Sequence, residues 1–357
     1  KACNATDEKG NKKMQFVTKN EILKEREMTS KDSGLIFSIT VISMFIASLA
    51  FVSVLGALAA ANGKSYNDYI ESVKDSFLYY AFNYLTSSAS LLAAILVFSA
   101  VKKIKPFSHA GYVKPQGKYI IIAVMLSFGL LFTFGELNEL FLSFLERFGF
   151  EKPDMKLPNG EWWQYLSWLV IVAVLPAVFE ETIFRGYIKK GFESASPVFS
   201  VLMGGFMFCI FHQNTQQTPY QFLCGVVFAL VALKSGSILP SVIMHFLNNA
   251  LTLTLNFAFG DSMPAALYYT LIAVGGVCFV VAMVYLLFFD KRKTEEPEKE
   301  KGDAITGSVA EGRKSTASGS KEKSPVKQTL SPFFLYSFVG FAVCIVSWIA
   351  DLITHIG

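Results

Sequence analysis

The stretch that decides the fold is Leu-Val-Ile-Val-Ala-Val-Leu-Pro-Ala-Val-Phe, residues 169–179, which leads directly into Glu180 and Glu181. Such an apolar run is typical of a membrane-spanning helix. Glu is among the residues least tolerated at membrane depth, because burying a carboxylate there costs desolvation energy that another contact has to offset. The pair therefore marks a candidate functional site as well as a span.

The composition of the whole chain indicates a membrane protein. Of its 357 residues, 52% are hydrophobic and 17% are charged, whereas soluble domains carry roughly 25% charged residues. The apolar residues come in blocks of about 20, the length that crosses a bilayer as a helix. No block alternates as the strands of a membrane barrel do. The chain is therefore predicted to be an all-α, polytopic transmembrane helical bundle with about eight to nine spans.

Nine apolar runs carry this prediction. The third is expected to continue as a helix through Leu145, and the fifth and sixth are short enough to need a tilt or shielding from lipid. The runs are Leu35–Ala60, Phe77–Val101, Tyr119–Phe134, Trp163–Phe184, Val198–Phe211, Phe222–Leu233, Ile238–Phe259, Leu267–Phe289 and Phe333–Ile356.

The distribution of Lys and Arg orients the runs. The N-terminal tail is basic, and cations also follow the second, fourth, sixth and eighth runs, while the loops between carry few. By the positive-inside rule we expect a cytoplasmic N-terminus in a multi-pass protein of the cell membrane. The cations that follow the runs are Lys102, Lys103 and Lys105, then Arg185, Lys189 and Lys190, then Lys234, and finally Lys291, Arg292 and Lys293.

Charge and composition divide the chain into a charged cytoplasmic tail (1–33), a transmembrane core (34–289), a linker (290–331) and a last transmembrane helix (332–357). The linker is rich in Lys, Glu, Ser and Gly and is expected to be disordered. The five cysteines show neither metal-ligand spacing nor a disulfide framework. The net charge of +4 is small, and we expect no nucleic-acid partner.

The polar groups within the later runs form three pairs with helical i, i+4 spacing: Glu181 with Arg185, Phe208 with His212, and His245 with Asn249. Glu180 is rotated by about 100° from Glu181 around the helix, so it cannot share Arg185 equally.

Each group taken alone has a simple structural explanation. An ion pair can close a helix end, and a buried His or Asn often bonds between membrane helices. Taken together they are costly to bury separately, and one water-filled cavity that groups them is cheaper. Such a cavity holds the parts for hydrolysis: a desolvated Glu as general base, one His to orient water, and a second His and an Asn to donate to an oxyanion.

Zinc is the alternative use of the same groups, since two His and one Glu form a known zinc set. The candidate ligands are Glu180, His212 and His245. The two histidines are far apart in the sequence and not arranged as H-E-x-x-H, so the sequence gives no firm metal site.

Three motifs in order resemble the CAAX protease and bacteriocin-processing (CPBP, or Abi) family of intramembrane endopeptidases, which includes the Rce1-type enzymes. The resemblance covers Leu175–Asn249 and places a protease region at about 163–259. The motifs are Pro176-x-x-x-Glu180-Glu181-Thr-Ile-Phe184-Arg185-Gly186, Phe208-x-x-x-His212 and His245-x-x-x-Asn249.

The resemblance implies roles and partners. Glu180 would activate water, and His212 would help to hold it. His245 and Asn249 would form the oxyanion hole. The supporting residues would be Glu181, Arg185 and Phe208. Because Asn248 is adjacent to Asn249, either residue could supply the amide of the last motif. Ala229 stands where many members of the family have a glycine. The implied partners are membrane lipid and a peptide or protein substrate of the prenylated or bacteriocin-precursor class. The resemblance also implies a bacterial cytoplasmic membrane as the location.

Two other classes stay open. A transporter could carry protons or ions on Glu180, His212 and His245, and a non-catalytic immunity or scaffold protein could keep the same residues. Depth is a further question. If the fourth helix ends near Lys189, Glu180 lies about 13 Å along the helix from that end. If the fifth helix begins near Val198, His212 lies about 20 Å from that start, so the two residues would lie at different depths.

Overall fold

The computed structural model describes residues 2–6, 12–16, 27–152, 161–260, 262–290 and 325–356. Within these residues, eight helices are long and apolar enough to cross a membrane. A ninth apolar helix, α9 (Pro197–Phe211), is shorter. The prediction of an all-helical bundle with about eight to nine spans is therefore confirmed, and the chain is a multi-pass membrane protein.

The helices follow one another as the apolar runs predict. The third run does continue as a helix past Leu145. The elements are β1 (Ala2–Thr6), β2 (Lys12–Phe16), α2 (Ser30–Ala61), α3 (Tyr66–Val73), α4 (Phe77–Lys102), α5 (Gly117–Phe128), η1 (Gly129–Phe134), α6 (Gly135–Glu146), α7 (Trp162–Trp168), η2 (Leu169–Val174), α8 (Leu175–Glu181), η3 (Thr182–Ile188), η4 (Lys189–Phe192), α9, α10 (Thr218–Ser235), α11 (Leu239–Phe259), α12 (Ala265–Val284), η5 (Tyr285–Phe289) and α13 (Pro325–Thr354).

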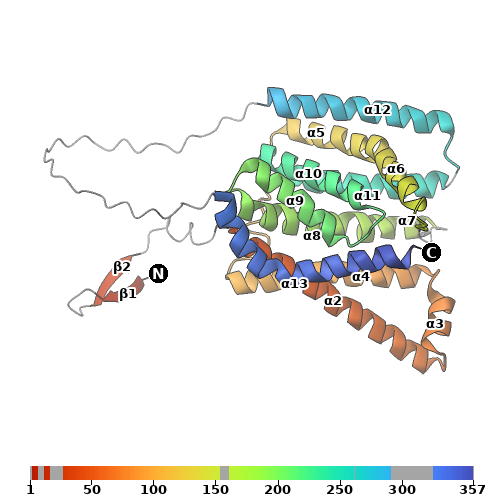
Figure 1. The fold of residues 1–357 in the computed structure, drawn as a ribbon, viewed down its shortest axis with the longest axis horizontal. Coiled ribbons are helices and arrows are strands. Elements are labelled where there is room, and N and C mark those ends of the chain that lie inside the picture. Colours follow the sequence, from red (N-terminus) through yellow and green to blue (C-terminus); the bar gives the residue numbers. More distant parts are fainter. Residues whose placement is uncertain are drawn as a thin grey trace.

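The helices with the polar motifs lie in the middle of the bundle (Figure 1). On one side α5 packs against α11 and α12, and on the other α13 packs against α2, which in turn packs against α4. Large apolar side chains on the outer helices face outward, with 76% of Leu78 and 75% of Leu335 exposed. Such exposure suits contact with lipid, because a soluble domain rarely leaves apolar surface of this extent uncovered.

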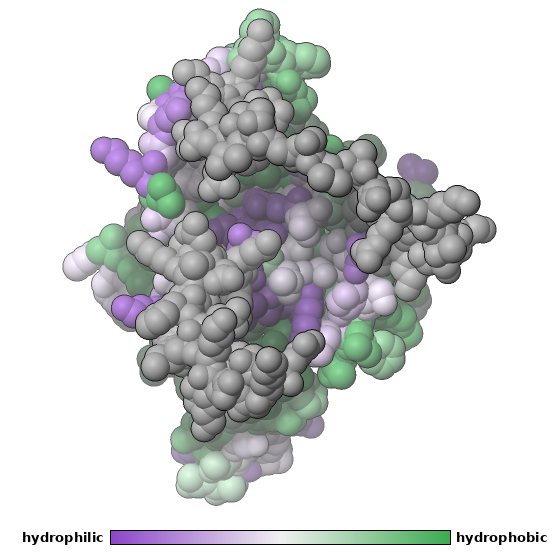
Figure 2. Space-filling view, turned by 90° about the vertical axis from the view of Figure 1, so that its left-hand side faces the viewer, coloured by the Kyte–Doolittle hydropathy of each residue, from purple (hydrophilic) through white to green (hydrophobic). Residues whose placement is uncertain are grey.

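Charged residues gather at one end of the bundle, which we call the basic end. There Lys102 of α4 pairs with Asp32 of α2 at 2.5 Å, and Lys118 of α5 pairs with Asp290 at 2.5 Å. Figure 2 faces this end and shows hydrophilic residues in the middle of a hydrophobic rim. The basic segments between runs thus lie at the same end of the bundle, as expected when successive helices alternate in direction.

Element bounds differ from expectation in three places. The fourth run, expected to end at Phe184, continues as helix to Phe192 through η3 and η4. Helix α13 begins at Pro325, inside the expected linker, while residues 291–324 of that linker lie outside the described residues. In the expected tail, β1 and β2 form an antiparallel pair, and residues 1, 7–11 and 17–26 lie outside the described residues.

Candidate active site

Three helical segments bring the predicted site residues together. Glu180 and Glu181 end α8 and are 9% and 0% exposed, His212 caps the C-terminus of α9, and His245 and Asn249 lie one turn apart on α11. The helix of the two glutamates is not uniform. It has π-helical turns before α8 and directly after it, and such turns occur frequently at functional sites.

The Glu181 carboxylate is the centre of a buried network. Its Oε1 accepts from Arg185 Nη1 at 2.8 Å, which confirms the predicted i, i+4 pair. The same oxygen accepts from His245 Nδ1 at 2.9 Å. Since both partners are buried, breaking the network would leave an uncompensated charge and cost about 3–5 kcal/mol. Glu181 therefore joins α8 to α11 as well as to the following turn.

Two aromatic rings and one carbonyl hold Arg185. Its guanidinium carbon lies 4.3 Å from the ring centre of Phe208 and 5.1 Å from that of Phe228, and Nη2 donates to the Gly225 carbonyl at 3.2 Å. Such stacking is favourable for a desolvated cation. The predicted supporting residue Phe208 thus contacts Arg185 directly, and its ring also lies 4.5 Å from that of His212.

Gly225 lets α10 approach α9. A Cβ placed on Gly225 would lie 2.7 Å from Gly205 Cα, closer than any real contact. The two backbones therefore touch, and the carbonyl of Gly225 is free to accept from Arg185. Ala229, one turn on, presents only a methyl group, which meets a Cβ built at Gly204 at an ordinary 3.5 Å.

Glu180 faces His212. The Nε2 atom of His212 lies 3.9 Å from Glu180 Oε2, too far for a hydrogen bond. The Nδ1 atom lies 2.8 Å from the Phe208 carbonyl, which can only accept, so Nδ1 carries the proton. In the neutral ring Nε2 is then an acceptor. Among the described residues, no donor bonds to the buried Oε2 of Glu180.

The partners of the two glutamates differ from the expectation in one respect. The sequence predicts one cavity that groups Glu180 with His212, His245 and Asn249, but Nδ1 of His245 bonds Glu181. The reason is the rotation between adjacent residues of a helix. Glu181 faces α11 and Arg185, while Glu180 faces the end of α9. His212 alone of the two histidines is therefore paired with Glu180.

Asn249 bonds the helix that carries Glu180. Its Nδ2 donates to the Val172 carbonyl at 3.0 Å, in the π-helical segment η2 that precedes α8. Asn248 instead accepts through Oδ1 from the Tyr220 hydroxyl of α10. Asn249 is thus the amide tied to the helix of Glu180.

Glu180 and His212 also lie at a similar depth along their helices. A Cβ placed on Gly204 would lie 3.5 Å from Lys189 Cβ, so these residues lie at one level. At about 1.5 Å per residue, Glu180 lies about 13 Å from that level and His212 about 12 Å. The mismatch expected from the sequence disappears because the fourth helix extends to Phe192.

The zinc alternative does not fit this arrangement. The three candidate ligands do not converge, because Glu180 faces His212 while His245 contacts Glu181. Across the described ranges, no group of three or more His, Cys, Asp or Glu side chains could hold a metal ion.

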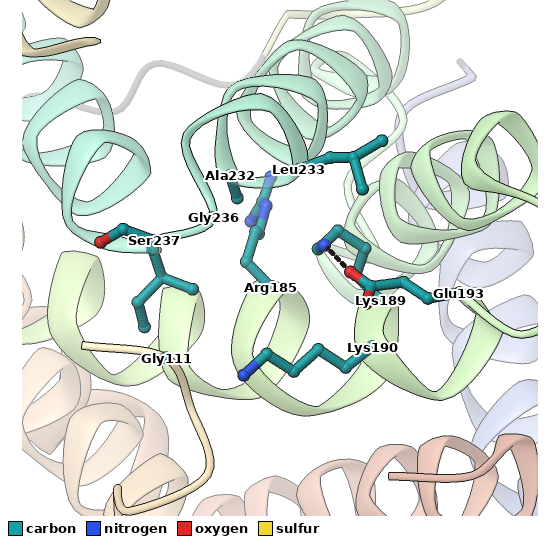
Figure 3. A pocket seen from close by; sticks show the side chains of 10 residues that line it. Gly111, Arg185, Lys189, Lys190, Glu193, Ala232, Leu233, Gly236 and Ser237 are labelled. Atoms are coloured by element: carbon teal, nitrogen blue, oxygen red, sulfur yellow. Dashed lines mark hydrogen bonds and ion pairs between the residues drawn. The ribbon is translucent and has the colours of Figure 1, made fainter. Parts of the chain in front are cut away.

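A polar cavity of about 150 Å³ lies on the basic side of Arg185, which helps to line it. In Figure 3 Lys189 pairs with Glu193, and the amine of Lys190 turns toward Gly111. That amine donates to the His109 carbonyl at 2.8 Å. Arg185 therefore separates the Glu181 network from the charged end of the bundle.

Fold and site together define a polytopic membrane protein with a buried carboxylate–imidazole site. Residues 162–251 match the family model of Rce1-like type II CAAX prenyl endopeptidases, a family of proteases. All four predicted catalytic residues lie in that segment. No curated protein and no solved structure matches the chain.

Some contacts of the site were not predicted from the sequence. The Gly225 carbonyl and the Phe228 ring hold Arg185, and Tyr220 holds Asn248. A glycine within an apolar helix does indicate close backbone approach. No pattern in the sequence indicates which carbonyl or ring an arginine will meet.

Proposed function

We propose that the chain is an intramembrane endopeptidase in which Glu180 activates water to hydrolyse a peptide bond. The single observation that carries this is the buried, unpartnered Glu180 Oε2 facing Nε2 of His212 at 3.9 Å. Two acceptors at that separation can share one water that donates to both. A water held this way has its oxygen lone pairs directed away from the carboxylate.

The proposed reaction uses this water as the nucleophile. Glu180 takes a proton from the water as its oxygen bonds to the scissile carbonyl carbon, which gives a tetrahedral oxyanion. The intermediate collapses as the bond to nitrogen breaks, and the proton passes from Glu180 to the leaving amine. A general base of this kind contributes about 10²–10⁴-fold in rate.

His245 and Asn249 are proposed to donate to the oxyanion. Nδ1 of His245 donates to the Glu181 carboxylate, so the proposed donor to the oxyanion is Nε2, and this role requires both ring nitrogens to carry a proton. Asn249 Nδ2 has two hydrogens and gives one to Val172, so the other is available. Donors fixed in advance by the protein stabilise a developing charge without reorganising.

The family suggests the substrate class. CAAX prenyl endopeptidases act on the C-terminus of prenylated proteins, and we propose a lipid-modified or membrane-associated peptide for this chain as well. Bacteriocin-like precursors are the other substrate class that the sequence resemblance implies. The basic end collects cations from alternate helix boundaries, which supports a cytoplasmic N-terminus. The bacterial membrane stays a prediction supported by the resemblance alone.

The test is cleavage of farnesylated and unmodified peptides by the purified, reconstituted protein, read by mass spectrometry. Glu180→Gln should lower the rate by about 10²–10⁴-fold and leave the melting temperature unchanged or higher, since it removes an unpaired buried charge. Glu139→Gln is the matched control, because that carboxylate is exposed and, within the described part of the chain, its ion pair is with Lys152. Full activity in Glu180→Gln would contradict the mechanism. Proton flux into vesicles without cleavage would favour the transporter.

A further inference from the structure

We propose that Asp351 of the C-terminal helix α13 is a positioning residue for His212, which it holds through the turn between α9 and α10. This turn comprises residues 212–217. The inference rests on the proposed function, because α13 affects catalysis here only through the role proposed for His212. Helix α13 lies outside the segment 162–251 that matches the family.

The turn has a conformation that needs outside support. Gln213, directly after His212, has a φ of 50°. A non-glycine residue adopts this left-handed conformation rarely, and it persists where the surrounding structure holds it. His212 stands at the C-cap of α9, so the direction of its ring depends on how the chain leaves the helix.

Helix α13 bonds the turn and the start of α10 through Asp351 and Trp348, and its Cys344 also contacts the side chain of Gln213. The Thr215 N–H donates to Asp351 Oδ2 at 2.8 Å, and the Thr215 hydroxyl donates to the Trp348 carbonyl at 3.4 Å. The Trp348 indole N–H donates to the Thr218 hydroxyl at 2.9 Å. The turn is thus tied at Thr215 and at the first residue of α10.

The end of α13 that carries Asp351 is itself anchored. His355 Nδ1 donates to the Asp351 carbonyl at 2.8 Å and lies 3.6 Å from Asp351 Oδ1. The His355 carbonyl accepts from the Glu151 N–H at 2.6 Å, which ties the end of α13 to the loop after α6. A carboxylate that bonds a backbone N–H is a strong acceptor.

The alternative explanation is that α13 supports the turn by packing alone. In that case the activity would depend on the apolar side chains of the helix and not on the acceptor at Asp351. Asp351→Ala removes the acceptor and no apolar side chain, so a loss of activity in that variant separates the two explanations. Ile353, two residues on and 65% exposed, controls for substitution on the same helix away from the turn.

The test compares kcat and KM for peptide cleavage in four variants. Asp351→Ala should lower kcat about tenfold or more, with KM changed less than about twofold. Asp351→Asn, which retains an oxygen acceptor, should keep at least about half of the wild-type kcat. Trp348→Phe should lower kcat by about threefold or more, and Ile353→Ala should leave it unchanged.

Hydrogen–deuterium exchange provides a second measurement that does not use activity. The peptide that contains Thr215 should exchange faster in Asp351→Ala than in wild type or Ile353→Ala. A wild-type kcat in Asp351→Ala, or an equal loss in Asp351→Ala and Ile353→Ala, would overturn the proposal. If Glu180→Gln is inactive while Asp351→Ala is fully active, the proposed function stands and this inference alone fails. If Glu180→Gln is active, the proposed function fails first.

Discussion

Glu180 Oε2 and His212 Nε2 face each other at 3.9 Å, and they come from two antiparallel helices joined by a short loop. The proton of His212 is on the other ring nitrogen, where the Phe208 carbonyl accepts it. The pair therefore presents two acceptors to one small site. A water molecule is the smallest group that can donate to both.

This relationship predicts how substitutions of His212 will behave. His212→Ala should lower kcat about 10²-fold or more, because the water loses one of its two acceptors. His212→Gln places an amide oxygen near the position of Nε2 and should retain more activity than His212→Asn, which can replace only Nδ1. Cleavage rates for the three variants measure this order. His109→Ala, in a loop at the basic end, serves as the control with wild-type activity, and equal losses in Gln and Asn variants would contradict the proposed acceptor.

The two neighbouring amides should separate catalysis from stability. Asn249→Ala should lower kcat by about 10²–10³-fold, the usual cost of removing one oxyanion donor. Asn248→Ala leaves the Tyr220 hydroxyl without its acceptor and should instead destabilise the protein by about 1–3 kcal/mol. Kinetics and thermal unfolding of both variants check the assignment. A catalytic loss confined to Asn248→Ala would move the role to that residue.

Much of the fold is predictable from the sequence because lipid imposes a simple rule. A backbone in hydrocarbon has to bond internally, so an apolar run of sufficient length becomes a helix. The Glu181–Arg185 pair is predictable for a related reason, since residues four apart meet on one face of a helix. Both predictions use only local spacing, and both are confirmed.

The partners across helices are harder to predict, since spacing along one helix says nothing about the rotation of another. His245 could have faced either glutamate, and the packing of α11 against α8 decides for Glu181. The bond from Asn249 to the Val172 carbonyl likewise depends on how α11 is rotated against η2. The contact of Asp351 with Thr215 joins residues 136 positions apart. No local pattern indicates that contact.

The contact between α9 and α10 predicts a strong effect of a single methyl group. Gly225→Ala would place a Cβ 2.7 Å from Gly205 Cα, so the helices would have to separate. The expected destabilisation is about 1–3 kcal/mol, and the Gly225 carbonyl would move away from Arg185. Gly56→Ala in α2 is the matched control, because nothing lies within 4 Å of its added Cβ. That variant should be neutral or more stable by up to about 1 kcal/mol, and thermal unfolding in detergent compares the two.

Chelation tests the separation of the two carboxylate–histidine pairs. If Glu180 pairs with His212 and Glu181 with His245, no third ligand completes a zinc set, and cleavage should continue in a strong chelator. A zinc enzyme would lose activity under the same treatment, because catalytic zinc supplies the nucleophilic water itself. Metal analysis of the purified protein provides a second measurement and should find less than one zinc per chain. Loss of cleavage in chelator, with recovery on adding zinc, would show instead that Glu180, His212 and His245 converge on an ion during catalysis.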